Sequence, residues 1–168
     1  MIPVATLTLN DGNKVPWIAF GTGTALARKD AQQPVALAIQ NGFTHLDTAQ
    51  MYENEGSVGA AIAASGKPRS ELYATTKLGL LQGEATPKSA LEISLRKLGL
   101  TYVNLYLVHH PKSHAGKLKE FGKEWKKPRM LAPPSPSVFP ILPLTISRKY
   151  SKLRLFPLLS IRCSVVQY

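Results

Sequence analysis

Short apolar segments of strand length alternate four times with segments of helical periodicity, and this alternation is the strongest constraint on the fold. The expected strands cover residues 17–20, 43–46, 71–76 and 103–108. Patterns with apolar residues on one helical face follow them, over residues 30–40, 58–64, 86–98 and 112–127. Such alternation predicts a parallel sheet covered by helices. Four units make half of a (β/α)8 barrel or most of a small doubly wound sheet, and periodicity does not choose between these two.

Turn-forming and capping residues predict where several elements begin and end. Residues 10–13 offer Asp-Gly turn chemistry between two short alternating segments, which predicts a β-hairpin ahead of the first unit. Asp30 is the expected N-cap of the first helix, and Gly42 stands near its C′ position. Thr86 followed by proline predicts the start of the third helix, and Gly99 predicts its end.

The composition of the chain changes near residue 127. Residues 1–111 carry nine Lys/Arg and eight Asp/Glu, whereas residues 112–168 carry twelve and two, so the net charge of +11 lies almost entirely in the second part. Seven of the 13 prolines fall between Pro128 and Pro157. A break of this kind marks a different sort of segment. We therefore expect one domain over residues 1–127 and an irregular, poorly ordered, basic and proline-rich tail over residues 128–168.

Several classes of protein are disfavoured by the sequence. The single Cys163 excludes an internal disulfide and a cysteine-based metal cluster, and we predict no metal site. The N-terminus lacks a basic segment followed by an apolar one, so no secretory signal is expected. The apolar stretches 138–146 and 155–161 are shorter than the roughly 20 residues that a membrane helix needs. We expect a soluble protein in the reducing cytoplasm, with no membrane partner.

Four residues suited to proton transfer follow successive expected strands. Asp47, Lys77 and His109 stand where a strand gives way to its loop, and Tyr52 lies on the loop after the second strand. A free tyrosine has a pKa of about 10, too high for an efficient general acid at neutral pH. A neighbouring ammonium lowers that value because it stabilises the phenolate, and a carboxylate keeps the lysine charged. Asp47, Lys77 and Tyr52 would form such a chain, and His109 could orient a substrate carbonyl.

Each of these residues alone has a more ordinary interpretation, such as a loop acid, a half-buried aromatic ring, a solvated lysine or a buried imidazole. Their joint occurrence at successive strand ends favours chemistry. His45 is interpreted as an ordinary buried histidine, and strand alternation is expected to turn it away from the face of Asp47. Residues 21–23 form only part of a dinucleotide fingerprint, because Leu26 replaces its third glycine. A tight turn is the favoured interpretation of that segment.

These residues lie in motifs that resemble those of the aldo-keto reductases over residues 4–124. Residues 44–59 resemble the first signature of that family, residues 71–78 its lysine-bearing strand, and residues 91–111 its second signature. The resemblance implies the N-terminal half of a (β/α)8 barrel that reduces an aldehyde or ketone with NADPH. It assigns protonation of the carbonyl oxygen to Tyr52, adjustment of Tyr52 to Lys77 and Asp47, and orientation of the substrate to His109. Binding positions are implied as well, near the cofactor for Gly21, Thr22, Gly23 and Asp47, and in the substrate pocket for His109 and His110.

The family pattern ends at about residue 127, before four further strand–helix units of a complete member. A shifted reading frame with freely chosen synonymous codons can turn residues 134–158 into peptides that resemble the fifth and sixth strands of the family. We therefore expect the tail to be a frame-shifted or mis-spliced read, which the coding DNA tests. Half a barrel leaves unpaired strand edges, so we expect a monomeric or aggregation-prone chain. Most of the NADPH site implied by the resemblance would be missing, so we expect impaired or lost activity.

Two alternatives belong to another class of function. The basic tail could bind nucleic acid or another polyanion, although translation of a wrong frame is the favoured source of its charge. The fragment could also be non-catalytic and associate with a full-length relative. The particular carbonyl substrate and the choice between NADPH and NADH stay open at this point.

Overall fold

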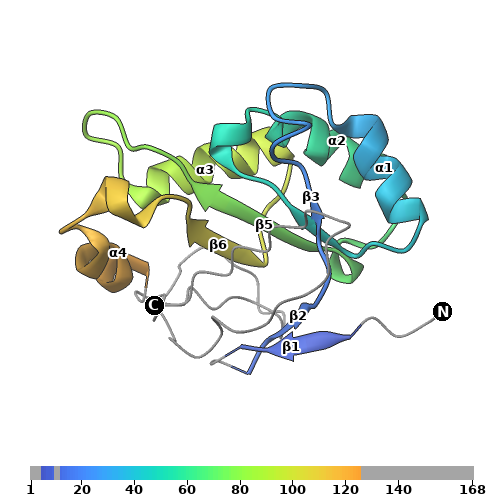
Figure 1. The fold of residues 1–168 in the computed structure, drawn as a ribbon, viewed down its shortest axis with the longest axis horizontal. Coiled ribbons are helices and arrows are strands. Elements are labelled where there is room, and N and C mark those ends of the chain that lie inside the picture. Colours follow the sequence, from blue (N-terminus) through green and yellow to red (C-terminus); the bar gives the residue numbers. More distant parts are fainter. Residues whose placement is uncertain (1–4, 10–11, 126–168) are drawn as a thin grey trace, which may run out of the picture.

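The structure is a computed structural model that describes residues 5–9 and 12–125 (Figure 1). An antiparallel hairpin comes first and consists of β1 (Thr6–Thr8) and β2 (Lys14–Pro16), with Leu7 opposite Val15. The turn closes through a 2.9 Å hydrogen bond from the Gly12 amide to the Leu9 carbonyl, and Gly12 has a φ of +84°. The predicted hairpin is confirmed.

Four parallel strands form the main sheet in the order β3-β4-β5-β6. They are β3 (Phe20–Gly21), β4 (His45–Asp47), β5 (Tyr73–Leu78) and β6 (Leu105–Val108). Each strand pairs with the next strand along the chain, as in a (β/α)8 barrel, whereas a doubly wound sheet reverses its strand order. The predicted fold class, a partial barrel of α/β type, is confirmed.

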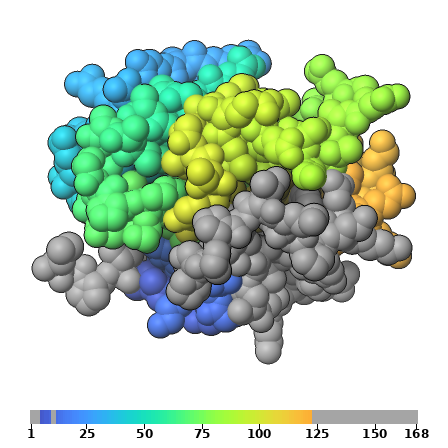
Figure 2. Space-filling model, turned by 180° about the vertical axis from the view of Figure 1, so that it is seen from behind, coloured from blue at the N-terminus to red at the C-terminus, as the bar shows by residue number. Residues whose placement is uncertain are grey.

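Helices cover one face of this sheet (Figure 1). They are α1 (Gln32–Gln40), α2 (Glu55–Ala64) and α3 (Pro87–Leu98), and each one connects two consecutive strands. The space-filling view shows the chain passing in order from blue through green to yellow across this outer surface (Figure 2). Alternate strand residues face the helices and make the core with them, including Leu46, Leu78, Tyr106 and Val108, each at most 6% exposed. The remaining strand residues point to the inner face, where Lys77 lies.

Local capping explains the ends of the helices. The Thr86 hydroxyl accepts a 3.2 Å hydrogen bond from the Ser89 amide, and Gly99 ends α3 in the left-handed conformation at φ +63°. The predictions for both ends of this helix are confirmed. Gly42, at φ +91°, follows the C-cap of α1 and so occupies the expected C′ position. The predicted N-cap is displaced by one residue, since Ala31 precedes α1 and the Asp30 carboxylate accepts from the Gln32 amide at 2.8 Å.

Three predicted boundaries were wrong. Only Phe20 of the expected strand 17–20 pairs in the sheet, and Trp17 remains 58% exposed. Helix α2 begins at Glu55 rather than at residue 58, because residues 52–54 already turn the chain towards it. The helix expected over 112–127 is divided into a 3₁₀ turn, Pro111–His114, and α4 (Leu118–Trp125). Gly116, with a φ of +84°, lies between these two pieces and interrupts the helical conformation.

The predictions about residues 128–168 fall outside the described part of the chain. They include the irregular tail, its frame-shifted origin and its affinity for polyanions, and all of them stay predictions. Across residues 5–9 and 12–125, no helix combines the length and the apolar character that crossing a membrane requires.

Candidate active site

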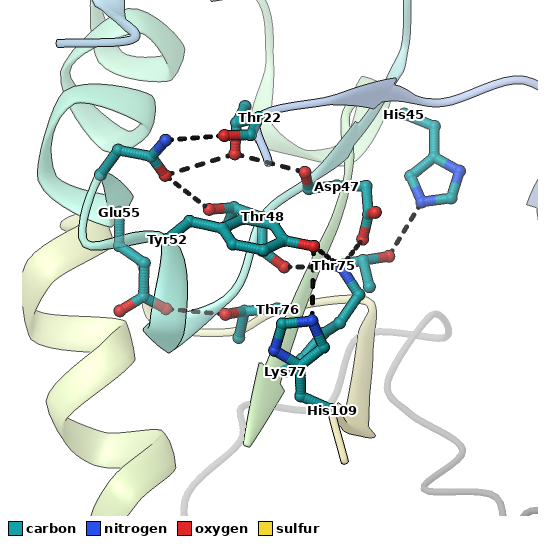
Figure 3. A network of polar contacts seen from close by, with 11 residues as sticks. Thr22, His45, Asp47, Thr48, Tyr52, Glu55, Thr75, Thr76, Lys77 and His109 are labelled. Atoms are coloured by element: carbon teal, nitrogen blue, oxygen red, sulfur yellow. Dashed lines mark hydrogen bonds and ion pairs between the residues drawn. The ribbon is translucent and has the colours of Figure 1, made fainter. Parts of the chain in front are cut away.

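The four predicted proton-transfer residues come together at the carboxyl end of the parallel sheet (Figure 3). The Lys77 ammonium lies 2.6 Å from Asp47 Oδ1 and 3.5 Å from the Tyr52 hydroxyl. The same hydroxyl lies 3.5 Å from Nε2 of His109. Asp47 ends β4, Lys77 lies in β5 and His109 follows β6, so three neighbouring strands supply three of the groups. Tyr52 ends a 3₁₀ turn over Gln50–Tyr52 that carries its ring back over the strand ends.

Lys77 is held in one orientation by three acceptors. Its ammonium donates to Asp47 Oδ1, to the Thr48 carbonyl at 3.1 Å and to the Tyr52 hydroxyl. An ammonium has three protons, so these acceptors use all of them. The Lys77 side chain is 11% exposed and that of Asp47 is 30% exposed. An ion pair with so little exposure is screened only weakly by solvent, and removal of one partner would leave a poorly compensated charge.

The position of the Tyr52 ring is set by the loop at the end of β3, residues 21–28, called the glycine loop below. A Cβ atom on Gly23 would lie 2.8 Å from Tyr52 Cζ, closer than real Cβ atoms approach. The absence of a side chain at Gly23 therefore lets the ring lie against the backbone of the loop. On the other side, the His109 ring packs edge-on at 5.3 Å between centroids. The Tyr52 carbonyl also accepts from the Arg28 amide at 2.7 Å, which ties the segment to the end of the same loop.

His109 is electrically neutral at physiological pH. Burial, then the Lys77 ammonium and His110 lower the pKa of His109 to about 4, and the Asp47 carboxylate only partly opposes this shift. A neutral imidazole has one N–H donor and one acceptor nitrogen, so it can donate a single hydrogen bond to a carbonyl oxygen. Its ring stacks on that of His110, with centroids 4.5 Å apart and planes inclined by 22°. The two predicted substrate-binding histidines thus lie side by side, with His110 on the exposed side.

The predicted cofactor-binding residues in the glycine loop differ in their exposure to solvent. Thr22 is fully buried, and its hydroxyl lies 3.3 Å from both the Asp47 carbonyl and Asn54 Oδ1. Its side chain therefore belongs to the wall of the site. Gly21 is exposed beside Asp47 in the sheet register, and a Cβ placed on it would meet nothing within 4 Å. Open space next to a partly exposed carboxylate suits a ligand that carries hydroxyl groups.

The prediction for His45 was wrong in its direction. Residues two apart on a strand share a face, so His45 lies on the same side of the sheet as Asp47. It is buried, and its Nε2 lies 2.8 Å from the Thr75 hydroxyl, while Nδ1 lies 3.2 Å from the Pro16 carbonyl (Figure 3). Burial lowers the pKa of His45, and the hydrogen bond to Pro16 opposes this shift. His45 therefore links the N-terminal hairpin to the layer beneath the site.

Two amide side chains near Tyr52 were missed by the sequence reasoning. Gln50 and Asn54 stand two residues before and two residues after it, and both form hydrogen bonds to segments distant in sequence. The only signal in the sequence was that both residues are polar and lie close to Tyr52, in the segment that follows the end of an expected strand.

The sequence of this chain matches the pattern of the Aldo/keto reductase family over residues 17–122, more than half of its length. An aldo-keto reductase of Mycobacterium sp. (strain MCS) is 44% identical over 115 residues, which cover 68% of this chain and 40% of the relative. Glycerol 2-dehydrogenase (NADP(+)) of Saccharomyces cerevisiae is 47% identical over 105 residues, or 62% of this chain and 33% of that enzyme.

Solved structures agree with this match. The crystal structure of an aldo-keto reductase of Bombyx mori in complex with NADP superposes with a TM-score of 0.58 at 40% identity, covering 66% of this chain and 39% of the other. The present chain thus spans less than half of the length of the relatives that it matches. Family pattern, strand order and site geometry lead to one conclusion. This chain belongs to the aldo/keto reductase family.

Proposed function

We propose that this chain carries the proton-transfer groups of an NADPH-dependent reductase that converts an aldehyde or ketone to an alcohol. The observation that supports the proposal is the series Asp47, Lys77, Tyr52 and His109, in which each side chain lies within hydrogen-bonding reach of the next. Tyr52 supplies the proton, because its hydroxyl is the one neutral O–H donor in the cluster and lies next to an ammonium. The family provides the reaction class, and a relative solved with NADP provides the cofactor.

The four side chains divide the work of protonating a carbonyl oxygen. His109 donates a hydrogen bond to that oxygen and orients it towards Tyr52. The Tyr52 hydroxyl passes its proton to the oxygen as negative charge develops there. Lys77 stabilises the phenolate that remains, since two unit charges 3.5 Å apart attract by about 5 kcal/mol at an effective dielectric constant of about 20. Asp47 reduces this attraction in part, but it holds the ammonium in place.

The residues around Gly21 fit a nicotinamide cofactor. Gly21 leaves space open above the loop, and the Asp47 carboxylate is partly exposed and can accept hydrogen bonds from ribose hydroxyls. NADPH, when bound, supplies the hydride for the carbonyl carbon. The residues of this chain around Gly21 form one side of the cofactor site and so bring the carbonyl close to Tyr52. We further propose low turnover by this chain alone, because residues 128–168 do not resemble the remaining units of the family.

A chimera separates the chemistry of the described segment from that of the tail. Residues 17–122 would replace the matching segment of the yeast glycerol 2-dehydrogenase, which contributes the rest of its own sequence. We expect aldehyde-dependent oxidation of NADPH by the chimera, and a loss of at least 100-fold in kcat with Tyr52→Phe. Tyr102→Phe is the matched control, since Tyr102 lies at the opposite end of β6 beside Arg69.

Two outcomes would count against the proposal. A folded chimera that reduces no aldehyde would show that the segment cannot perform the chemistry. A chimera that stays active after Tyr52→Phe would show that another group donates the proton. The same assay on the unaltered chain measures its own turnover, and a rate equal to that of the chimera would contradict the proposed impairment.

A further inference from the structure

Two amide side chains bracket the proposed acid at equal distances along the chain. Gln50 lies two residues before Tyr52 and Asn54 lies two residues after it. Asn54 is only 3% exposed, and Gln50 is half-buried. Neither amide touches the Tyr52 hydroxyl, so neither takes part directly in proton transfer. Their partners, however, lie on the segments that surround the tyrosine ring.

Asn54 joins the glycine loop to the end of β4. Its Nδ2 donates to the Thr22 carbonyl at 2.8 Å and to the Leu26 carbonyl at 2.9 Å. Its Oδ1 accepts from the Thr48 hydroxyl at 3.1 Å and shares the single proton of the Thr22 hydroxyl, at 3.3 Å, with the Asp47 carbonyl. An amide side chain offers two donors and two acceptor sites, and all four are occupied here. Gly23, against which the Tyr52 ring packs, is one of the three residues between Thr22 and Leu26.

Gln50 joins the other side of the segment to β5 and α3. Its Oε1 accepts from the Gly79 amide at 2.7 Å, two residues beyond Lys77. Its Nε2 donates to the Ala90 carbonyl at 2.8 Å and to the Ser94 hydroxyl at 2.9 Å, both in α3. Gln50 thus connects the chain before Tyr52 to the end of β5, the strand of Lys77. Asn54 connects the chain after Tyr52 to the end of β4, the strand of Asp47.

We infer that Gln50 and Asn54 are positioning residues that hold the Tyr52 hydroxyl between Lys77 and His109. The inference rests on the proposed function, because it concerns the residue proposed as the acid. Both hydroxyl contacts are 3.5 Å long, at the outer limit of a hydrogen bond, so a small displacement of the ring would break them. Each amide restrains a different flank of the segment, and loss of either one frees the ring to move.

If the two amides had only a general structural role, their loss would affect the Tyr52 ring no more than the loss of a distant amide. Asn104 provides that comparison. Asn104 lies at the opposite end of the same sheet, where its Oδ1 accepts from the Ala74 amide at 2.9 Å and from Arg69 at 2.8 Å. Asn104→Ala removes a well-bonded amide far from Tyr52. It should lower the melting temperature as Asn54→Ala does, but it should leave the tyrosine ring where it is.

The test is ¹⁹F NMR of the full chain labelled with 3-fluorotyrosine, with the Tyr52 signal assigned by its disappearance in Tyr52→Phe. We expect Asn54→Ala and Gln50→Ala to shift or broaden the Tyr52 signal and to make it at least twofold more sensitive to a soluble paramagnetic probe. Asn104→Ala should leave both properties unchanged. Asn54→Asp, which keeps the acceptors and loses the donors, serves if Asn54→Ala does not fold.

The measurement needs neither cofactor nor turnover, so it is independent of the proposed function. An unchanged Tyr52 signal in both Gln50 and Asn54 variants would overturn the inference. The same would follow if Asn104→Ala altered the signal equally, because the effect would then reflect general loosening. A reductase that stays active after Tyr52→Phe would refute the proposed function instead, and the NMR result would still show whether the amides place the ring.

Discussion

The crossing of α2 and α3 depends on a single glycine, and its replacement gives the most quantitative prediction. A Cβ on Gly59 would overlap the Leu98 carbonyl oxygen and lie 2.5 Å from its carbon, whereas ordinary contacts begin near 3.4 Å. All three nearest atoms belong to the backbone, so no side chain can turn aside. The two helices must therefore separate by about 1 Å to accommodate Gly59→Ala.

The expected loss follows from the contacts at this crossing. Val58, Ile62, Leu91 and Leu98 are buried around it. A gap of up to 1 Å removes about a quarter to a half of each dispersion contact, each worth about 0.1–0.2 kcal/mol. With middle values for both quantities and about 50–80 such contacts across the crossing, the loss is roughly 3–4.5 kcal/mol, and the higher helix propensity of alanine returns about 1 kcal/mol. We expect Gly59→Ala to lower the free energy of unfolding by about 2–3 kcal/mol.

Gly56→Ala is the matched control in the same helix. Gly56 is exposed, and its Cβ would meet only the Lys97 carbonyl oxygen at 3.9 Å. We expect this variant to be more stable than the parent by roughly 0.5–1 kcal/mol, because alanine restricts the unfolded chain. Urea unfolding followed by circular dichroism measures both values. If the two variants differed by less than about 0.5 kcal/mol, the close approach of the helices would be refuted.

Three further predictions concern the site. Asp47→Asn leaves the Lys77 ammonium without its carboxylate and should lower the free energy of unfolding in urea by about 1–3 kcal/mol, less than for a fully buried pair. The control is Glu71→Gln, in a more exposed pair with Lys67 at 4.0 Å, which should change that free energy by less than about 0.5 kcal/mol. Gly23→Ala must displace the Tyr52 ring by about 0.6 Å and should lower kcat of the chimera by tenfold or more, and an unchanged kcat would show that the ring contact is unimportant. An NMR titration should place the pKa of His109 near 4, against 6.5 when unfolded. The unfolded state then binds more protons between those values, so stability falls as pH drops from 6.5 towards 4, and a midpoint near 6.5 would contradict the burial described.

The sequence was most informative where local chemistry is decisive. Thr86 with its following proline and Gly99 define α3 by themselves, because capping and backbone conformation act over one helical turn. The grouping of Asp47, Lys77 and His109 was also predictable, since parallel strands end at the same edge of a sheet. Tyr52 was part of the predicted group as well, but its position depends on a 3₁₀ turn that periodicity does not reveal.

Other features were misjudged, some for local reasons and some because they depend on contacts between distant segments. The direction of His45 was misjudged although alternation alone determines it, because residues 45 and 47 share a face. The roles of Gln50 and Asn54 arise only after α3 and the glycine loop come near them. The break of the helix expected over 112–127 follows from the positive φ of Gly116, while its apolar spacing suggested one continuous helix.

The neighbour-to-neighbour order of the strands has a consequence for how the site is made. Each strand pairs with the one that precedes it along the chain, so sheet formation requires only the closure of loops of about 25–30 residues. Asp47 and Lys77 lie on consecutive strands, so their ion pair needs only one such closure, whereas His109 reaches Tyr52 after two. The two charges can therefore meet before the histidine joins the site.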